Sequence, residues 1–226
     1  MRTASTHLDE RAVRIPADSV ILDGDLSIPA DAVGIVCFAH GSGSSRHSSR
    51  NRFVAGELNR AGLATLLMDL LTGTEESVDV VTRHLRFDIG LLAHRLVGAA
   101  EWLRSERATS RLPIGMFGAS TGGGAALVAA AQRPTLIGAV VSRGGRPDLA
   151  ADSLPAVKCP TLLIVGSLDD VVIDLNEEAM ARMRAPVRLE IVEGATHLFE
   201  EPGTLEQVSS LARDFFLVHL AEPARR

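Results

Sequence analysis

A five-residue motif, Gly118-Ala119-Ser120-Thr121-Gly122, constrains the fold of this chain more than any other part of its sequence. An apolar run at residues 113–117 precedes the motif, and a run of small residues at 123–128 follows it. This order predicts a buried strand, a sharp turn and the start of a helix. A serine on such a turn stands exposed above the sheet, with its oxygen near the positive end of the helix. Glycines suit the flanks because the turn is tight and the helix packs close to the strand.

Strand and helix patterns alternate along the rest of the chain. The strand patterns lie at residues 11–15, 20–28, 33–39, 64–71, 113–119, 137–142, 161–166 and 187–192, and the helix patterns at 53–61, 86–104, 121–132, 176–184 and 204–220. The first two strands are expected to form an antiparallel pair, because Pro16-Ala17-Asp18 breaks the run between them. The other strands are largely apolar and separated by helices, which predicts a parallel sheet covered on both faces.

Composition limits the class of protein. The 226 residues are 46% hydrophobic and 23% charged, an ordinary balance for one globular domain spanning residues 1–226. Aromatic residues make up 4% and the net charge is −5, which argues against nucleic acid as the main partner. No apolar run approaches the roughly 18 residues of a membrane span. Residues 1–14 contain Asp9, Glu10 and Arg11 rather than the apolar core of a signal peptide. We therefore expect a cytoplasmic protein without a membrane partner.

Neither the cysteines nor the acidic residues suggest a metal or a cofactor. Cys37 and Cys159 lie in or beside apolar runs, so both are expected to be buried free thiols rather than a disulfide. Two cysteines without a histidine cluster do not make a zinc site. Glu75, Glu76 and Asp79 have no coordinating pattern and are expected in a solvated loop over residues 72–83, for which we predict no metal.

Three polar residues follow three successive parallel strands. Ser120 follows the strand that begins at Pro113, Asp169 follows residues 161–166, and His197 follows residues 187–192. The carboxyl ends of parallel strands lie at one edge of a sheet, which is where open sheets of this kind bind ligands. The order serine, aspartate, histidine is the one associated with such sheets. We therefore expect the three side chains to converge.

The residue types suit nucleophilic catalysis. A serine hydroxyl is a poor nucleophile at neutral pH and requires a base. Histidine can take the proton and return it to the leaving group, while a carboxylate orients the imidazole. Taken singly, Ser120 could be a turn residue, Asp169 a helix cap and His197 a loop residue, but their shared position after strands favours a triad. Asp170 is the alternative acid, and Asp169 is preferred because it comes first after the turn.

A glycine-rich turn follows the strand at residues 33–39. Its backbone N–H groups can stabilise an oxyanion, with Ser42 as the expected donor and Gly43 as the alternative. The N–H of Thr121, the residue after the nucleophile, is the expected second donor. A phosphate-binding loop is the competing interpretation, but the lysine of that motif is missing. His40 is expected to hold the turn by hydrogen bonds rather than to act as a base.

These motifs resemble the α/β-hydrolase superfamily and, within it, the dienelactone hydrolase-like family. The resemblance extends from His40-Gly41-Ser42-Gly43 through the Ser120 motif to Asp169 and His197. It implies an α/β-hydrolase fold, a three-layer sandwich with a mostly parallel sheet of about eight strands. Residues 143–160 are too few for a large cap domain. Dienelactone hydrolases proper carry cysteine at the position of Ser120, so their lactone specificity does not transfer.

The resemblance implies a serine hydrolase that cleaves small ester, thioester or lactone substrates through an acyl-enzyme. An acyltransferase or a peptidase could use the same triad, because the outcome depends on what reaches the acyl-enzyme. A binding or regulatory module that recognises an anionic ligand or a protein partner is the alternative outside enzymes. Edge strands of the sheet leave both a monomer and a homodimer open.

Arginines gather after the expected strand ends and before the long helix. They are Arg46, Arg50, Arg52, Arg83, Arg86, Arg143 and Arg146. Arginine binds carboxylate or phosphate through two parallel hydrogen bonds, which suggests an anionic substrate. The competing interpretation is that they pair with Asp69, Asp88 and Asp148 to hold loops, and for any single arginine this is preferred. Arg143 is the candidate for a substrate contact.

Overall fold

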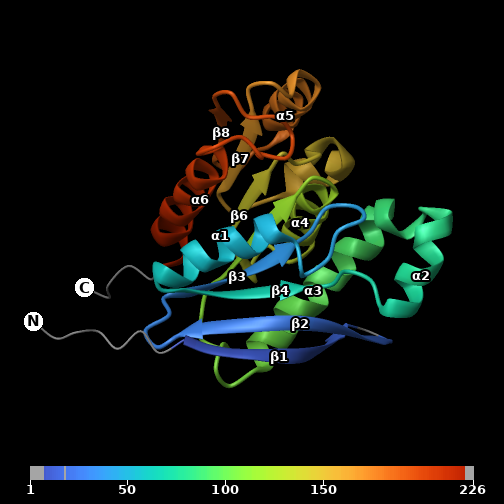
Figure 1. Ribbon diagram of the computed structural model, residues 1–226, viewed down its shortest axis with the longest axis vertical. Helices are drawn as coiled ribbons and strands as arrows, with labels where there is room; N and C mark the ends of the chain where they lie inside the picture. The colour runs from blue at the N-terminus through green and yellow to red at the C-terminus, as the bar shows by residue number, and fades with distance from the viewer. Residues whose placement is uncertain (1–7, 18, 222–226) are drawn as a thin grey trace, which may run out of the picture.

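The computed structural model of the protein describes residues 8–17 and 19–221. Eight strands form one sheet in the order β1-β2-β4-β3-β5-β6-β7-β8. They are β1 (Leu8–Ala17), β2 (Val20–Pro29), β3 (Gly34–Ala39), β4 (Leu63–Met68), β5 (Ile114–Ala119), β6 (Ile137–Arg143), β7 (Thr161–Gly166) and β8 (Val187–Val192). β1 and β2 are antiparallel to their neighbours, and the other strands are parallel to one another (Figure 1).

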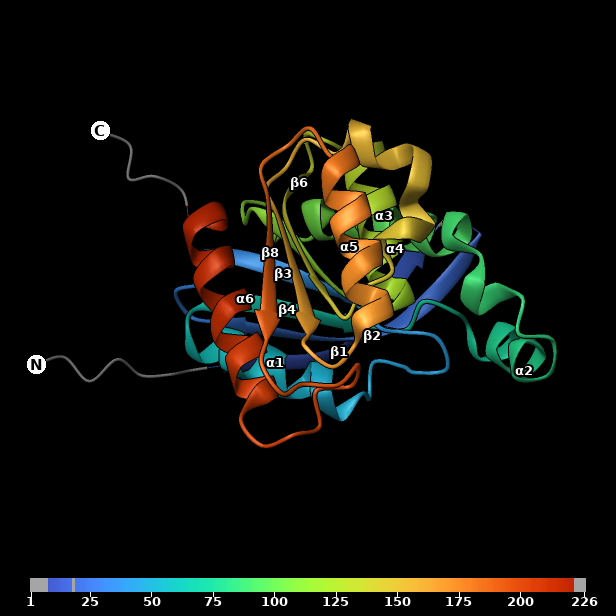
Figure 2. The same ribbon diagram turned by 90° about the horizontal axis from the view of Figure 1, so that it is seen from above.

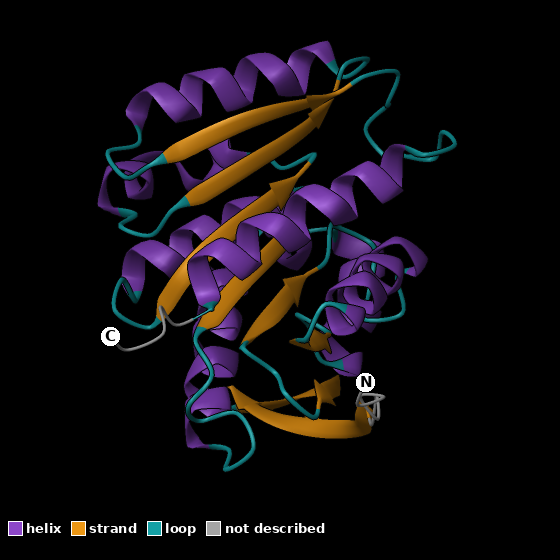
Figure 3. Cartoon of the chain, turned by 90° about the vertical axis from the view of Figure 1, so that its left-hand side faces the viewer, coloured by secondary structure: helices purple, strands orange, loops and turns teal. Residues whose placement is uncertain are grey.

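Helices cover both faces of the sheet (Figure 3). One face carries α1 (Ser49–Arg60) and α6 (Thr204–Leu220), and the other carries α3 (Ile89–Ser105), α4 (Thr121–Gln132) and α5 (Asp170–Arg182). Two short 3-10 segments, η1 (Leu85–Phe87) and η2 (Pro147–Ala156), join the larger elements. The predicted three-layer α/β fold with eight strands and a mostly parallel sheet is confirmed.

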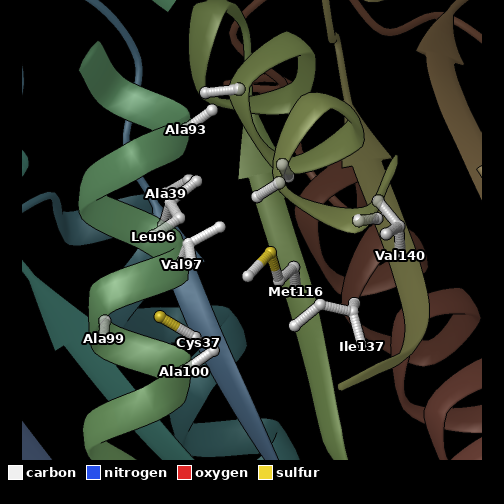
Figure 4. Close-up of a cluster of buried hydrophobic side chains, with 14 of the residues drawn as sticks. Cys37, Ala39, Ala93, Leu96, Val97, Ala99, Ala100, Met116, Ile137 and Val140 are labelled. Carbon is white, nitrogen blue, oxygen red and sulfur yellow. The ribbon is translucent and has the colours of Figure 1, made fainter. Parts of the chain in front are cut away.

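The core lies in two layers, because side chains of a central strand alternate between the two faces. In β3, Ile35 and Cys37 pack towards α3, and Val36 and Phe38 pack towards α1 and α6. Figure 4 shows part of the first layer, in which small α3 residues such as Ala93 and Ala100 lie close to α4 and β3. Small side chains allow this approach, and their contacts stabilise the layer through apolar burial.

Both cysteines are buried free thiols, as predicted. Burial raises the pKa of the Cys37 thiol to about 12 and that of Cys159 to about 11. A thiol with such a pKa remains protonated at neutral pH, and the thiolate is the reactive form. The two cysteines therefore behave as small apolar residues.

The predicted solvated loop at residues 72–83 is wrong, because this segment forms the helix α2 (Gly73–Thr82). Thr72 accepts a hydrogen bond from the backbone N–H of Glu75, and the Glu75 carboxylate accepts one from the N–H of Thr72. This reciprocal pair satisfies two backbone donors that a helix start otherwise leaves unpaired. Glu75 also binds the buried Arg95 at 2.8 Å. The helix lies away from the sheet (Figures 1 and 2).

Other differences concern the ends of elements. α1 begins at Ser49, capped by Ser48, and α5 begins at Asp170 directly after β7, so both helices start earlier than their apolar patterns predict. Of the N-terminal segment 1–14, residues 8–14 lie in β1, and residues 1–7 lie outside the described part of the chain. Asp18 of the predicted turn also lies outside it, while Pro16 and Ala17 continue β1.

Within residues 8–17 and 19–221, no helix combines the length and the hydropathy needed to cross a bilayer. Over the same residues, no group of three or more histidine, cysteine, aspartate or glutamate side chains is arranged to hold a metal ion.

Candidate active site

Ser120 lies on a strained turn between β5 and α4. Its backbone has φ 51° and ψ −121°, a conformation that costs a residue with a side chain about 1–3 kcal/mol. Three backbone hydrogen bonds hold it there: the Ser120 N–H donates to the Arg143 carbonyl oxygen (3.2 Å), and the Ser120 carbonyl oxygen accepts from the N–H groups of Gly123 (2.9 Å) and Arg146 (3.1 Å). A Cβ at Gly118 would lie 2.5 Å from the Gly122 carbonyl oxygen, so glycine is required for this close approach. The turn therefore lifts the serine above the end of β5.

Asp169 and His197 form a hydrogen-bonded pair. The Asp169 Oδ2 atom lies 2.6 Å from His197 Nδ1. A carboxylate accepts, so Nδ1 carries the proton and Nε2 is left as an acceptor. Asp169 comes directly after the β7 turn, and His197 lies in the loop after β8. Asp170 is exposed at the first position of α5, so the structure pairs Asp169 rather than Asp170 with the histidine.

Ser120 and His197 line one pocket at the carboxyl ends of the strands. The pocket has a volume of about 240 Å³ and is also lined by Gly41, Ser42 and Arg143. The three strand-end residues predicted from the sequence therefore meet, through the pocket that Ser120 shares with His197 and the bond from His197 to Asp169. The arrangement places a hydroxyl, an imidazole and a carboxylate in the order that nucleophilic catalysis requires.

The loop after β3 is held in place by His40. The His40 ring accepts a hydrogen bond from the Leu70 N–H at Nε2 (3.2 Å), so its proton lies on Nδ1, which is 2.9 Å from the Gly41 carbonyl oxygen. In a trans peptide the N–H points away from the C=O. The Ser42 N–H is therefore directed opposite to His40. Ser42 lines the pocket with Ser120, whereas Gly43 lines only a smaller space, which Ser42 and Thr121 line as well.

Thr121 occupies the first position of α4 and is buried. The first N–H groups of a helix have no intrahelical acceptor, and they lie at the positive end of the helix dipole. The Thr121 N–H therefore lies next to the Ser120 side chain with its hydrogen-bonding capacity unused by the helix. An N–H group in this position has the geometry expected of a second hydrogen-bond donor to an oxyanion.

The loop that carries His197 has supports that sequence reasoning missed. The Glu201 carboxylate accepts from both the N–H (3.1 Å) and the hydroxyl (2.6 Å) of Thr196, the residue before the histidine. The hydroxyl bond, above all, lowers the pKa of Glu201. Gly144 lies against the imidazole, where a Cβ would be 3.5 Å from His197 Nδ1. A Thr-x-x-x-x-Glu spacing and a lone glycine carry no recognisable signal in a single sequence.

Most of the arginines pair with acidic residues. Arg46 binds Asp69 and Asp25, Arg52 binds Asp25, Arg86 binds Asp79, and Arg146 binds Asp148. The loop-holding interpretation therefore describes these four. Asp88 does not pair as predicted, because its carboxylate instead accepts the Leu91 N–H and caps α3.

Arg143 differs from these arginines. It is 7% exposed and lines the pocket, and its contacts are the Leu198 carbonyl oxygen at 3.5 Å and the face of the Phe199 ring at 5.6 Å. Burial, and then the charge of Arg50, lowers the pKa of Arg143 to about 10. The Nε atoms of both arginines are buried without a hydrogen-bond partner among the described residues. The pocket thus holds positive charge with unused donors.

Asn51 is a further pocket residue that sequence reasoning missed. It is 2% exposed, and its Oδ1 atom is buried without a hydrogen-bond partner in the described part of the chain. It lies in α1, which begins earlier than predicted, and the earlier start brings it to the pocket. Asn51 and Ser120 line the same pocket, and the structure shows no acceptor role for this oxygen among the described residues.

Comparison with known proteins agrees with this fold. The model of the dienelactone hydrolase family matches residues 22–214. A crystal structure of dienelactone hydrolase from Anabaena variabilis ATCC 29413 is 60% identical and superimposes with a TM-score of 0.93, covering 94% of this chain and 99% of that one. Est1E from Butyrivibrio proteoclasticus has a TM-score of 0.76 at 18% identity, covering 92% and 98% of the two chains, which shows a shared fold.

A curated relative in Mycobacterium tuberculosis (strain H37Rv) has the name "Putative phosphoribosyl transferase Rv0571c". It is 56% identical over 220 residues, which are 97% of this chain and 49% of that protein. This chain therefore spans about half the length of that relative. The family match covers most of the chain and agrees with the close structural relative, so the chain belongs to the dienelactone hydrolase family.

Proposed function

We propose that this protein is a serine hydrolase that cleaves small ester, thioester or lactone substrates through an acyl-enzyme. The observation that carries the proposal is the meeting of Ser120 with His197, itself bonded to Asp169, at one pocket. The family supports hydrolysis as the reaction class, and the serine in place of cysteine makes the nucleophile a hydroxyl that depends on its base.

The first half of the reaction forms the acyl-enzyme. Ser120 Oγ attacks the substrate carbonyl carbon while His197 Nε2 takes the hydroxyl proton. Asp169 holds the imidazole in the required tautomer and stabilises its charged form. The carbon–oxygen bond to the leaving group then breaks, and His197 returns the proton to the leaving alcohol or thiol.

The second half releases the acid. Water attacks the acyl carbonyl, His197 takes the water proton, and Ser120 regains it as the ester bond breaks. In both halves negative charge develops on the carbonyl oxygen, where the N–H groups of Ser42 and Thr121 donate hydrogen bonds. Loss of one such donor typically lowers the rate by about 10²–10³.

Arg143 supports an anionic substrate. A buried guanidinium without a carboxylate partner is costly, and a bound carboxylate or phosphate supplies the missing charge. The neighbouring Arg50 adds positive charge to the same pocket, although it also binds the exposed Glu200 at 2.9 Å. We therefore propose that the acid or alcohol part of the ester carries a negative group.

Two measurements test the proposal. A fluorophosphonate probe should label the wild-type protein and not Ser120→Ala, and a panel of chromogenic esters should be hydrolysed only by the wild type. Retained turnover in Ser120→Ala would refute the assignment of Ser120 as the nucleophile. A folded wild-type protein that neither labels nor turns over any ester would favour a binding module instead.

Added acceptors and amide substrates distinguish a hydrolase from an acyltransferase or a peptidase. An acyltransferase would release product faster when an alcohol or amine acceptor is added, and a peptidase would cleave amide as well as ester substrates. The phosphoribosyl transferase in the name of the mycobacterial relative describes a protein about twice as long. Incubation of this chain with phosphoribosyl diphosphate would test that activity separately.

A further inference from the structure

The strand β8 leaves one edge of the sheet unpaired. Among the described residues it pairs with β7 and with no other strand. Figure 2 shows β8 between α6 and α5, with its ribbon in full view. An open edge presents a row of backbone N–H and C=O groups to any further strand.

The backbone directions in β8 follow from its ladder with β7. The carbonyl oxygens of Pro186 and Val192 accept hydrogen bonds from Thr161 and Ser167. Successive residues of a strand direct their backbone groups to opposite edges. Val187, Leu189 and Ile191 therefore present their N–H and C=O groups to the open edge.

The side chains of β8 carry charges of both signs. Arg188 and Glu190 lie two residues apart and so share one face of the sheet, where they bind each other at 2.5 Å. Leu189 lies between them on the opposite face, and Ile191 is 40% exposed there. Charges on an edge strand oppose pairing where like charges would face each other across the interface. In β8 the two charged residues, Arg188 and Glu190, are of opposite sign and bind each other.

Opposite charges select one register for an antiparallel pair of two β8 strands. If Leu189 lies on the two-fold axis, Arg188 faces the partner's Glu190, and Ile191 faces the partner's Val187. A shift of the axis to Arg188 would place arginine opposite arginine, and a shift to Glu190 would place glutamate opposite glutamate. The register centred on Leu189 also lets all three outward residues exchange both backbone hydrogen bonds.

We propose that two copies of this chain associate through antiparallel pairing of their β8 strands, centred on Leu189. The two sheets then form one continuous sheet across a two-fold axis, an isologous interface in which the same strand contributes from each copy. The pairing strand is short, so the dimer is expected to dissociate in the micromolar range. The antiparallel arrangement points the carboxyl ends of the strands in the two copies in opposite directions. The two pockets therefore face away from each other, and each copy is expected to act independently.

A charge-swap series tests the register. Sedimentation velocity over a range of micromolar concentrations should show a monomer–dimer equilibrium for the wild type. Arg188→Glu and Glu190→Arg should each weaken the dimer about tenfold, because like charges then face each other across the axis. The double variant Arg188→Glu/Glu190→Arg should restore the dimer, since opposite charges again face each other.

Arg60→Glu on α1 is the matched control, because it makes the same charge change at an exposed site away from β8. Circular dichroism establishes that each variant is folded. A wild type that stays monomeric at all concentrations would overturn the proposal. So would single variants that dimerise as well as the wild type, or a folded double variant that stays monomeric.

Discussion

The Nδ1 atom of His40 lies 2.9 Å from the carbonyl oxygen of Gly41, and this bond sets the plane of the peptide unit that ends in the Ser42 N–H. The histidine is itself oriented by the Leu70 N–H, which fixes its proton on Nδ1. The proposed oxyanion donor at Ser42 is thus positioned by a residue that does not line the pocket of Ser120.

The first prediction concerns this positioning role. His40→Ala should lower kcat for ester hydrolysis by about 10–100-fold with little change in KM, because it misdirects one oxyanion donor rather than removing the nucleophile. Steady-state kinetics with a chromogenic ester measures kcat and KM separately. His40→Gln, which keeps a donor and an acceptor, should recover part of kcat. Equal kinetics in all three proteins would contradict the role.

The second prediction follows from the titration of the same histidine. Burial lowers the pKa of His40 below 6.5, and the nearby Asp69 and Glu76 carboxylates only partly offset this effect. The unfolded chain therefore takes up the proton first as pH falls, so stability is lost progressively below pH 6.5. Urea unfolding at a series of pH values should show a shallower acid slope in His40→Gln than in the wild type.

The third prediction separates the two neighbouring aspartates. Asp169→Asn should lower kcat by about 10³–10⁴, because an amide no longer stabilises the charged His197 and can favour the wrong tautomer. Asp170→Asn is the matched control at an exposed helix start and should stay within about twofold of the wild type. Burst and steady-state rates with one ester are the measurement, and similar losses in both variants would point to a structural effect.

The fourth prediction concerns Arg143. Arg143→Ala should raise KM for anionic esters by about 10–100-fold and leave neutral esters of the same size nearly unchanged, because only the anion loses a charged hydrogen bond. Arg143→Lys should restore part of the affinity. Arg146→Ala removes an arginine that already binds Asp148 and serves as the control. Equal effects on anionic and neutral esters would contradict a substrate contact.

The fifth prediction concerns the attachment of α2. The buried Asp79 carboxylate accepts from the N–H of Leu85 at 2.7 Å and from Arg86 Nε at 2.6 Å, which ties α2 to the segment that follows it. Asp79→Asn should increase amide exchange and proteolytic cleavage within residues 72–88 several-fold, because it breaks a buried ion pair. Exchange in β5 and β7 should stay as in the wild type. Cleavage spread evenly over the chain would instead indicate global destabilisation.

The sequence by itself determined the sheet and the order of the chemistry. Continuous apolar runs mark β3, β5 and β7, because strands buried on both faces leave no polar alternation. Ser120 and Asp169 each follow such a run, His197 follows the mixed strand β8, and parallel strands bring their carboxyl ends together. These inferences depend on local sequence patterns and on a general rule of sheet topology, so a single sequence was sufficient to make them.

Only the tertiary structure decided which charges are satisfied. Arg143 and Arg146 are three residues apart in sequence, yet Arg146 binds Asp148, whereas Arg143 lies buried at the pocket without a carboxylate partner among the described residues. Likewise α2 depends on Glu75 reaching Arg95, a residue of another helix. Pairing of this kind is set by distances between segments far apart in the chain. The energy of a buried charge depends on its neighbours in space, and neither composition nor periodicity specifies these neighbours.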